Sequence, residues 1–199
     1  MVKLNGLVLA GGRSTRMGQD KSLLTYHGKP QCEHLTDLLR PYCEQVFWSV
    51  NADQAADLYQ TDSPLIVDAF DVATPLNGIL SAFQRAPDAA WLVVACDMPL
   101  LTSQSFDALL AGRNRAKLAT VFYDSDGQLP EPLLGIYEPT FWPVLQQAVA
   151  HGQSSPRKLL RMNDIQLLTV PDVHELTNTN DPAGRATILA QTTTGKSGS

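Results

Sequence analysis

The chain has 199 residues, of which 44% are hydrophobic, 18% charged and 7% aromatic. This composition is typical of a single soluble α/β or α+β domain and excludes a disordered, collagen-like or disulfide-stabilised chain. The net charge of −5 provides no overall positive field, so we expect neither nucleic acid nor an anionic membrane surface as a partner. The longest apolar run, residues 89–96, is too short to cross a bilayer, and no secretory signal is recognisable, so a cytoplasmic protein is expected.

Apolar, β-branched runs alternate along the chain with stretches of helical spacing. Strands are predicted, in chain order, at residues 6–10, Val46–Val50, Leu65–Val67, 91–95 and 118–123. Helices are predicted at Gln31–Leu39, at 103–110 with Ser103 as the N-cap, and at 141–149. Continuously apolar strands, each followed by a helix, predict an α/β fold with a mostly parallel sheet and helices on both faces. Ligands of such sheets bind at the carboxyl ends of the strands.

The length of the chain predicts one domain, expected over residues 1–191, and no internal repeat is visible. The tail 192–199 is almost entirely small and polar, which predicts a disordered C-terminus. The three cysteines, Cys32, Cys43 and Cys96, lack Cys-x-x-Cys spacing. We therefore expect them to be buried thiols without a chemical role.

The segment that follows the first predicted strand reads LAGGRSTRMGQDK. Gly11 and Gly12 allow a sharp turn and the close approach of a ligand to backbone N–H groups. Arg13, Arg16 and Lys21 add three cations that can neutralise a polyphosphate. These features favour a phosphate-binding loop over the alternative, a glycine turn with a solvated basic flank. The segment has neither a Gly-x-Gly-x-x-Gly motif nor a P-loop glycine, which disfavours a dinucleotide-binding dehydrogenase and a P-loop NTPase.

This segment resembles the signature of the MobA-type nucleotidyltransferases, which attach GMP to the molybdenum cofactor. Further matches follow in the family's order at Val50-Asn51-Ala52, Asp68, Pro75-Leu76-Asn77-Gly78, Cys96-Asp97-Met98-Pro99 and Asn178-Thr179-Asn180-Asp181-Pro182. The resemblance implies a Rossmann-like nucleotidyltransferase fold, GTP as the nucleotide, Mg²⁺ as the metal, and molybdopterin or the molybdenum cofactor as the acceptor. Transient contact with proteins that handle the cofactor is expected as well.

The resemblance also assigns roles by position. It implies nucleotide binding at the ends of the predicted strands, by Leu9, Ala10, Gly11, Gly12, Arg13, Lys21, Asn51, Asp68 and Asp97. It further implies that Arg16, Lys21 and Asp97 are catalytic and that Asp97 holds the metal.

Local chemistry is compatible with these roles but also with simpler ones. Asp97 follows a buried strand, where a hard oxygen ligand can meet a Mg²⁺ ion that substrate phosphates also hold. Its alternative role is to cap the turn at Met98-Pro99. Asp68 can accept hydrogen bonds from a guanine edge or a ribose. Asn51 and Asp68 can equally stabilise strand-end turns, so their assignment rests on the resemblance.

Two late features are candidates for binding the acceptor. Asn178 and Asn180 are two residues apart, on one side of an extended segment, where they can orient the acceptor phosphate or the metal. Their alternative role is to cap the helix after Asp181-Pro182. Arg157 belongs to a basic cluster with Lys158 and Arg161. This cluster can meet the phosphate of the acceptor or form a solvated helix face.

The expected reaction is attack by the terminal phosphate of molybdopterin on the α-phosphorus of GTP, with release of pyrophosphate. The nucleophile is already anionic, so catalysis consists of aligning two anions and screening their repulsion, a role for Mg²⁺, Arg16 and Lys21. No general base is needed.

Three alternatives remain: a cytidylyltransferase for the same cofactor, a sugar-phosphate nucleotidyltransferase, and a regulatory nucleotide-binding domain without catalysis. The sequence Leu9-Ala10-Gly11-Gly12 stands where the cytidylyl branch tends to have Thr-Ala-Ala-Gly, which favours GTP. Retention of Arg16, Lys21 and Asp97 disfavours the regulatory domain. Residues 127–137 only approximate the family's Pro-Leu-rich strand, and no role is assigned to Glu131 within them.

Overall fold

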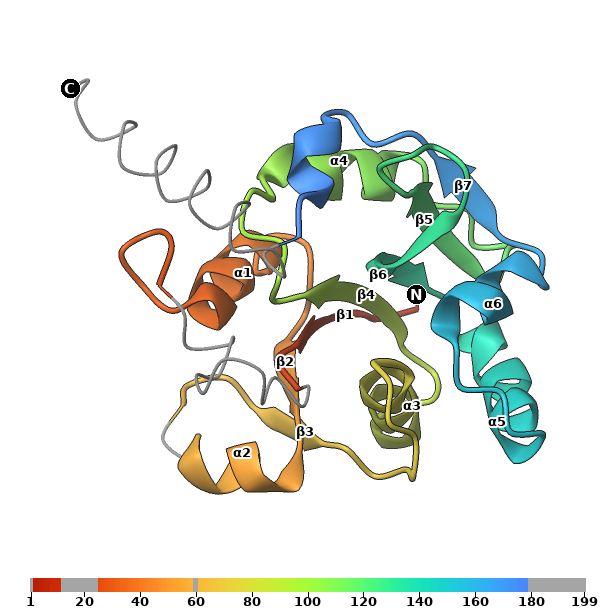
Figure 1. Ribbon diagram of the computed structural model, residues 1–199, viewed down its shortest axis with the longest axis horizontal. Coiled ribbons are helices and arrows are strands. Elements are labelled where there is room, and N and C mark those ends of the chain that lie inside the picture. Colours follow the sequence, from red (N-terminus) through yellow and green to blue (C-terminus); the bar gives the residue numbers. More distant parts are fainter. Residues whose placement is uncertain (1, 12–24, 59–60, 179–199) are drawn as a thin grey trace.

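A computed structural model describes residues 2–11, 25–58 and 61–178 of the chain (Figure 1). Seven strands form one sheet, and they are β1 Leu4–Leu9, β2 Val46–Val50, β3 Leu65–Val67, β4 Ala90–Ala95, β5 Ala119–Tyr123, β6 Pro130–Tyr137 and β7 Gln166–Leu168. The α-helices are α1 Gln31–Leu39, α2 Ala52–Asp57, α3 Leu76–Arg85, α4 Ser103–Ala111, α5 Trp142–Ala150 and α6 Pro156–Arg161. Two 3₁₀ turns are η2 Pro139–Phe141 and η3 Val173–Leu176.

The sheet is mixed but mostly parallel, in the order β3-β2-β1-β4-β6-β5-β7. Strands β3, β2, β1 and β4 are parallel neighbours, β5 and β7 also pair in parallel, and β6 is antiparallel to both β4 and β5. The carboxyl ends of β1 to β4 therefore lie at the same edge of the sheet as the amino end of β6.

Helices cover both faces of the sheet, with α1 and α4 on one side and α3, α5 and α6 on the other (Figure 1). Strand β4 shows why its sequence is continuously apolar. Leu92 and Val94 belong to one core, and Trp91 and Val93 belong to the other. Because successive side chains of a strand point to opposite faces, a strand covered on both sides must be apolar at every position. The predicted fold is thus confirmed.

Most predicted elements agree with the structure in position. The strands at Val46–Val50 and Leu65–Val67 and the helix at Gln31–Leu39 have the predicted bounds, and the remaining predicted elements differ by one or two residues at their ends. The predicted N-cap of α4 was wrong, because the side chain of Thr102, not Ser103, accepts a hydrogen bond from the Gln104 N–H at 3.2 Å.

The three cysteine thiols differ in burial. Cys32 and Cys96 are buried as expected, whereas Cys43 is only partly buried, and burial raises the pKa of its thiol to about 12. The described helices include none with the length and apolar character needed to cross a membrane. The tail 192–199 lies outside the described residues.

Candidate active site

Four predicted site residues lie at the ends of four adjacent parallel strands. Gly11 follows β1, Asn51 follows β2, Asp68 follows β3 and Asp97 follows β4. Since these strands end at one edge of the sheet, the fold brings together residues that are far apart in the sequence. This is the edge at which α/β sheets bind ligands.

The carboxyl end of β1 lies between the ends of β2 and β4 at this edge. The side chains of Leu9 and Ala10 are buried in the two cores, so only their backbone faces the edge. The N–H groups of Ala10 and Gly11 both donate to the Ser49 carbonyl, at 3.0 and 2.8 Å. The expectation that Gly11 offers its N–H to a phosphate does not fit this geometry. The hydrogen bond of Gly11 instead connects the residues after β1 to β2.

Asn51 begins α2 with a reciprocal capping box. Its Oδ1 accepts from the Gln54 N–H at 2.9 Å, and its own N–H donates to Gln54 Oε1 at 3.1 Å. Gln54 Nε2 also donates to the Ala10 carbonyl at 3.2 Å, which ties α2 to the end of β1. The simpler alternative for Asn51, stabilisation of a strand-end turn, is therefore present in the structure.

Asp68 is a half-buried carboxylate beside a hydroxyl. Ser49 Oγ donates to Asp68 Oδ1 at 3.3 Å. Burial raises the pKa of Asp68, and the Ser49 hydrogen bond opposes that rise. A ligand that donates hydrogen bonds to this carboxylate would relieve the cost of its burial.

Asn77 is a site residue to which the sequence interpretation assigned no role. Its Oδ1 accepts from the Phe70 N–H at 3.1 Å, and its Nδ2 donates to the carbonyls of Phe70 and Val72 at 2.5 and 3.2 Å. Ser81, one turn later on α3, accepts from the Ala69 N–H at 3.0 Å. The start of α3 thus holds the loop that follows Asp68. The signal in the sequence that could have identified Asn77 was the family match at Pro75-Leu76-Asn77-Gly78.

Gly78 allows α3 to approach the sheet closely. A Cβ built on Gly78 would lie 2.2 Å from Ser49 Oγ and 2.7 Å from Leu9 Cδ2. No side chain fits at these distances without displacing β1 or β2 residues at the edge where Asp68 is held.

We expect Gly78→Ala to destabilise the protein by about 1–3 kcal/mol through overpacking, although alanine is the better helix former by about 1 kcal/mol. Urea unfolding measures this change. Gly11→Ala is the matched control, because a Cβ there meets its nearest atom, the Ser49 carbonyl oxygen, at an ordinary 3.5 Å. Unchanged or increased stability of Gly78→Ala would contradict the close packing of α3.

Asp97 lies in a turn that two distant residues hold. Gln31 Nε2 donates to the Met98 carbonyl at 3.3 Å, and His27 Nε2 lies 2.7 Å from the Pro99 carbonyl oxygen. Gln31 begins α1 and is fully buried, so the Asp97 turn is attached to a rigid element. The Asp97 side chain itself is partly buried.

The antiparallel ladder between β4 and β6 brings a second carboxylate to the same place. Val94 pairs with Leu134 near the end of this ladder, and Asp97 and Glu131 each lie three residues beyond that pair. Burial raises the pKa of Glu131, and the charge of Asp97 contributes to that rise. Glu131, which had no interpretation in the sequence, therefore belongs to the site.

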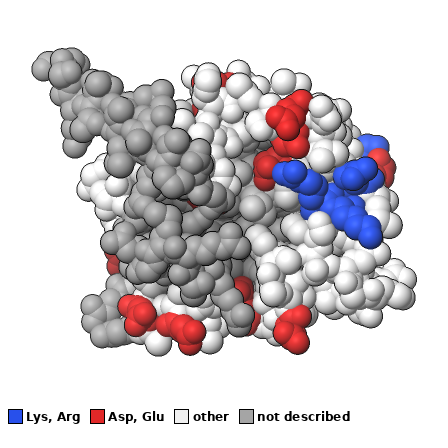
Figure 2. Space-filling view, in the orientation of Figure 1, with Lys and Arg blue, Asp and Glu red and all other residues white. Residues whose placement is uncertain are grey.

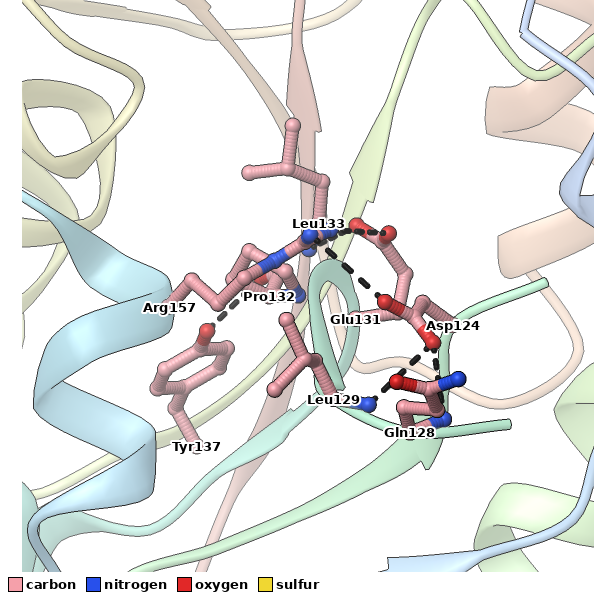
Figure 3. Close-up of polar contacts among 8 residues, drawn as sticks. All are labelled: Asp124, Gln128, Leu129, Glu131, Pro132, Leu133, Tyr137 and Arg157. Carbon is pink, nitrogen blue, oxygen red and sulfur yellow. Dashed lines mark hydrogen bonds and ion pairs between the residues drawn. The ribbon is translucent and has the colours of Figure 1, made fainter. Parts of the chain in front are cut away.

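Arg157 is the member of the predicted basic cluster that faces the site. Its Nη2 donates to Glu131 Oε2 at 3.2 Å, and its Nη1 lies 3.6 Å from Asp124 Oδ2 (Figure 3). Lys158 and Arg161 are exposed, and Figure 2 shows the Lys and Arg side chains that gather over α6. The cluster thus combines a solvated face with one arginine that contacts carboxylates.

Asn178 lies at the end of the described chain and is exposed. Glu175, three residues earlier, is buried and accepts hydrogen bonds from the Thr102 N–H at 3.2 Å, from the Ser105 hydroxyl at 2.5 Å and from the Thr102 hydroxyl. Glu175 therefore attaches the segment before Asn178 to Thr102 and Ser105 at the start of α4. Sequence reasoning missed Glu175, which no motif marks.

Several predicted residues are outside the described part of the chain. They are Gly12, Arg13, Arg16, Lys21 and Asn180. Within residues 2–11, 25–58 and 61–178, no group of three or more His, Cys, Asp or Glu side chains could hold a metal ion. A divalent cation at Asp97 would thus need further ligands, such as water and substrate phosphates, and Mg²⁺ commonly binds in this way.

Comparisons with known proteins identify the family of the chain. The family described as "MobA-like NTP transferase domain" matches residues 6–170. The chain is 33% identical over 183 residues to a Molybdenum cofactor guanylyltransferase of Pseudomonas putida, covering 88% of this chain and 92% of the relative. It is 37% identical over 179 residues to a Molybdenum cofactor biosynthesis bifunctional protein of Synechocystis, covering 90% of this chain but only 52% of that longer relative.

A solved structure is similar over the whole fold. The molybdopterin-guanine dinucleotide biosynthesis protein A from Archaeoglobus fulgidus superposes with a TM-score of 0.79 at 20% sequence identity, covering 96% of this chain and 99% of that chain. At this identity the similarity shows the fold.

Proposed function

Because the chain belongs to the family of MobA-like NTP transferase domains, we propose that it transfers GMP from GTP to the terminal phosphate of molybdopterin or of the molybdenum cofactor. The products are pyrophosphate and the guanine dinucleotide form of the cofactor. The observation that carries this proposal is similarity over nearly the full length of relatives named as molybdenum cofactor guanylyltransferases.

The site chemistry supports a nucleotidyl transfer without a general base. An oxygen of the acceptor phosphate attacks the α-phosphorus of GTP, and the bond between that phosphorus and the pyrophosphate oxygen breaks. Both reactants are anions, so the protein must align them and screen their repulsion. We assign this role to Arg16 and Lys21 in the segment after β1, and Asp97 at the end of β4 would hold a divalent cation that serves the same purpose.

The donors at the sheet edge fit a hard divalent cation, for which we propose Mg²⁺. Asp97 supplies a carboxylate oxygen from a turn that α1 holds rigid. A bound Mg²⁺ would screen the charge of the reacting phosphates. Asp97 would fix the ion relative to the sheet.

On the nucleotide side, we propose that Asp68 accepts hydrogen bonds from the guanine or the ribose. Asn51 would contact the nucleoside through its amide nitrogen, because its Oδ1 already caps α2. Leu9, Ala10 and Gly11 would contribute shape through the backbone turn, and Gly12 and Arg13 would meet the phosphates.

On the acceptor side, we propose Arg157, Asn178 and Asn180 as contacts of the acceptor phosphate. Arg157 offers a planar fork of donors that suits a phosphate. Transient contact with proteins that supply or receive the cofactor belongs to the same proposal, as does a cytoplasmic location.

We expect GTP to exceed CTP, ATP and UTP in kcat/KM by at least about 10², because a site built on base hydrogen bonds rejects bases that leave those groups unpaired. The measurement is pyrophosphate release with purified protein, molybdopterin and each nucleotide in turn. Omission of molybdopterin is the control, and it should abolish release. Equal use of CTP and GTP would contradict the assignment of guanylyl transfer while leaving nucleotidyl transfer intact.

A further inference from the structure

Glu131 lies in the part of β6 where the pairing with β5 is irregular. Val121 pairs with Gly135, whereas Tyr123 pairs with Pro130, so the ladder between β5 and β6 changes register between these pairs. Such irregularities release part of a strand from regular pairing and redirect its side chains. Glu131 lies in the released part of β6, and Asp97 follows β4, the other neighbour of β6 in the sheet.

The carboxylate of Glu131 is fixed by its own strand. Its Oε1 accepts a hydrogen bond from the Leu133 N–H at 3.0 Å. The adjacent backbone is also fixed, because the fully buried Tyr137 donates its hydroxyl to the Pro132 carbonyl at 2.7 Å (Figure 3). The other carboxylate oxygen, Oε2, accepts a hydrogen bond from the Arg157 side chain.

Asp124 fixes the other side of the same guanidinium. Its Oδ1 accepts from the N–H groups of Gln128 and Leu129 at 3.1 and 3.2 Å, in the hairpin between β5 and β6. Arg157 thus lies between two carboxylates that backbone N–H groups hold in place. A guanidinium has five N–H donors, so two such contacts leave donors for an anionic ligand.

Stability alone does not explain this arrangement. The side chain of Arg157 is 40% exposed, and an ion pair with such an exposed partner contributes little to stability. Helix α6 is instead attached by the buried Leu159 and Leu160. Burial raises the pKa of Glu131, and the carboxylates of Asp97 and Asp124 add to this, while the Leu133 N–H and Arg157 lower it. Neither the exposed ion pair nor the attachment of α6 requires a carboxylate at this position, which points to a role in function.

We propose that Glu131 is a positioning residue, which holds the Arg157 guanidinium across the sheet edge from Asp97 so that it meets the acceptor phosphate in one orientation. The inference rests on the proposed function. Without the Glu131 charge, Arg157 would keep its own charge and its contact with Asp124 but lose the second contact that fixes its direction.

The test compares Glu131→Gln, Arg157→Lys and the double variant. Glu131→Gln keeps the size and the acceptor for the Leu133 N–H but loses the charge on Oε2. We expect it to raise the KM for molybdopterin about tenfold, as is typical for loss of a supporting contact, and to leave the KM for GTP unchanged. Arg157→Lys keeps the charge but loses the fork, so it should have a similar effect. The double variant should be no worse than Arg157→Lys, because both changes disable one unit.

The matched control is Glu44→Gln, which removes the partner of Lys3 at the other end of the sheet and should change neither KM. Anaerobic calorimetric titration with molybdopterin gives a second reading, independent of turnover. Absence of guanine dinucleotide formation by the wild-type protein would refute the proposed function, and the titration would still decide the role of Glu131. Unchanged molybdopterin affinity in Glu131→Gln, an equal loss for GTP, or effects that multiply in the double variant would overturn the inference.

Discussion

Asp97→Asn is expected to lower turnover by about 10²–10³, equivalent to about 3–4 kcal/mol of transition-state stabilisation. Asparagine keeps the volume of the side chain but removes the charge that would attract a divalent cation. The turn that carries residue 97 is held by Gln31 and His27 through backbone carbonyls, so the fold should be unchanged.

The measurement is a Mg²⁺ titration of the turnover rate for the wild type and the variant. The Mg²⁺ concentration for half-maximal rate should rise, in addition to the fall in the maximal rate. Asp164→Asn is the control, because it removes a carboxylate from an exposed ion pair with Lys117. A folded Asp97→Asn protein with near-normal rates at limiting Mg²⁺ would remove Asp97 from the metal site.

Glu138→Ala should destabilise the protein by about 3–5 kcal/mol, because it would leave a buried guanidinium without its counter-charge. Arg113 forms a two-point contact with Glu138, with Nε–Oε1 at 2.6 Å and Nη2–Oε2 at 2.9 Å. The two side chains are only 7% and 3% exposed. Water therefore cannot replace the lost carboxylate.

Urea unfolding of three variants checks this expectation. Glu138→Ala should show the large loss, and Asp164→Ala, from the exposed pair with Lys117, should lose no more than about 1 kcal/mol. Combining Arg113→Met with Glu138→Leu should recover most of the stability, because two apolar side chains need no partner. A small loss in Glu138→Ala alone would show that Arg113 finds solvent when its partner is removed.

Much of the sheet could be predicted because its strands are covered on both faces. Burial on both sides requires uninterrupted apolar sequence, which is visible in Ala90–Ala95 and Val46–Val50 without knowledge of the partners. Strand β6 carries two prolines and a glycine, and its pairing depends on a hairpin and a register change. Helix α3 was not predicted, because Asn77 and Gly78 are poor helix formers. Their presence is explained by their contacts, since Asn77 accepts a hydrogen bond from the Phe70 N–H and Gly78 lies close to Ser49.

The site was predictable where a residue follows a strand and less so where it depends on pairing. Asp97 could be placed because the end of a parallel strand is a known location for ligands. Glu131 could not, since only the antiparallel pairing of β6 with β4 brings its part of the chain to the end of β4. The N–H of Gly11 was expected to face a phosphate, but it donates to the Ser49 carbonyl of the neighbouring β2.

Guanylyl transfer to the pterin cofactor can be tested directly by analysis of the product. Purified protein is incubated with GTP, Mg²⁺ and molybdopterin, and the cofactor is analysed by mass spectrometry while pyrophosphate is quantified. The expected product is heavier than molybdopterin by one GMP unit less water, with one pyrophosphate released for each product molecule. Unmodified molybdopterin together with intact GTP would contradict guanylyl transfer.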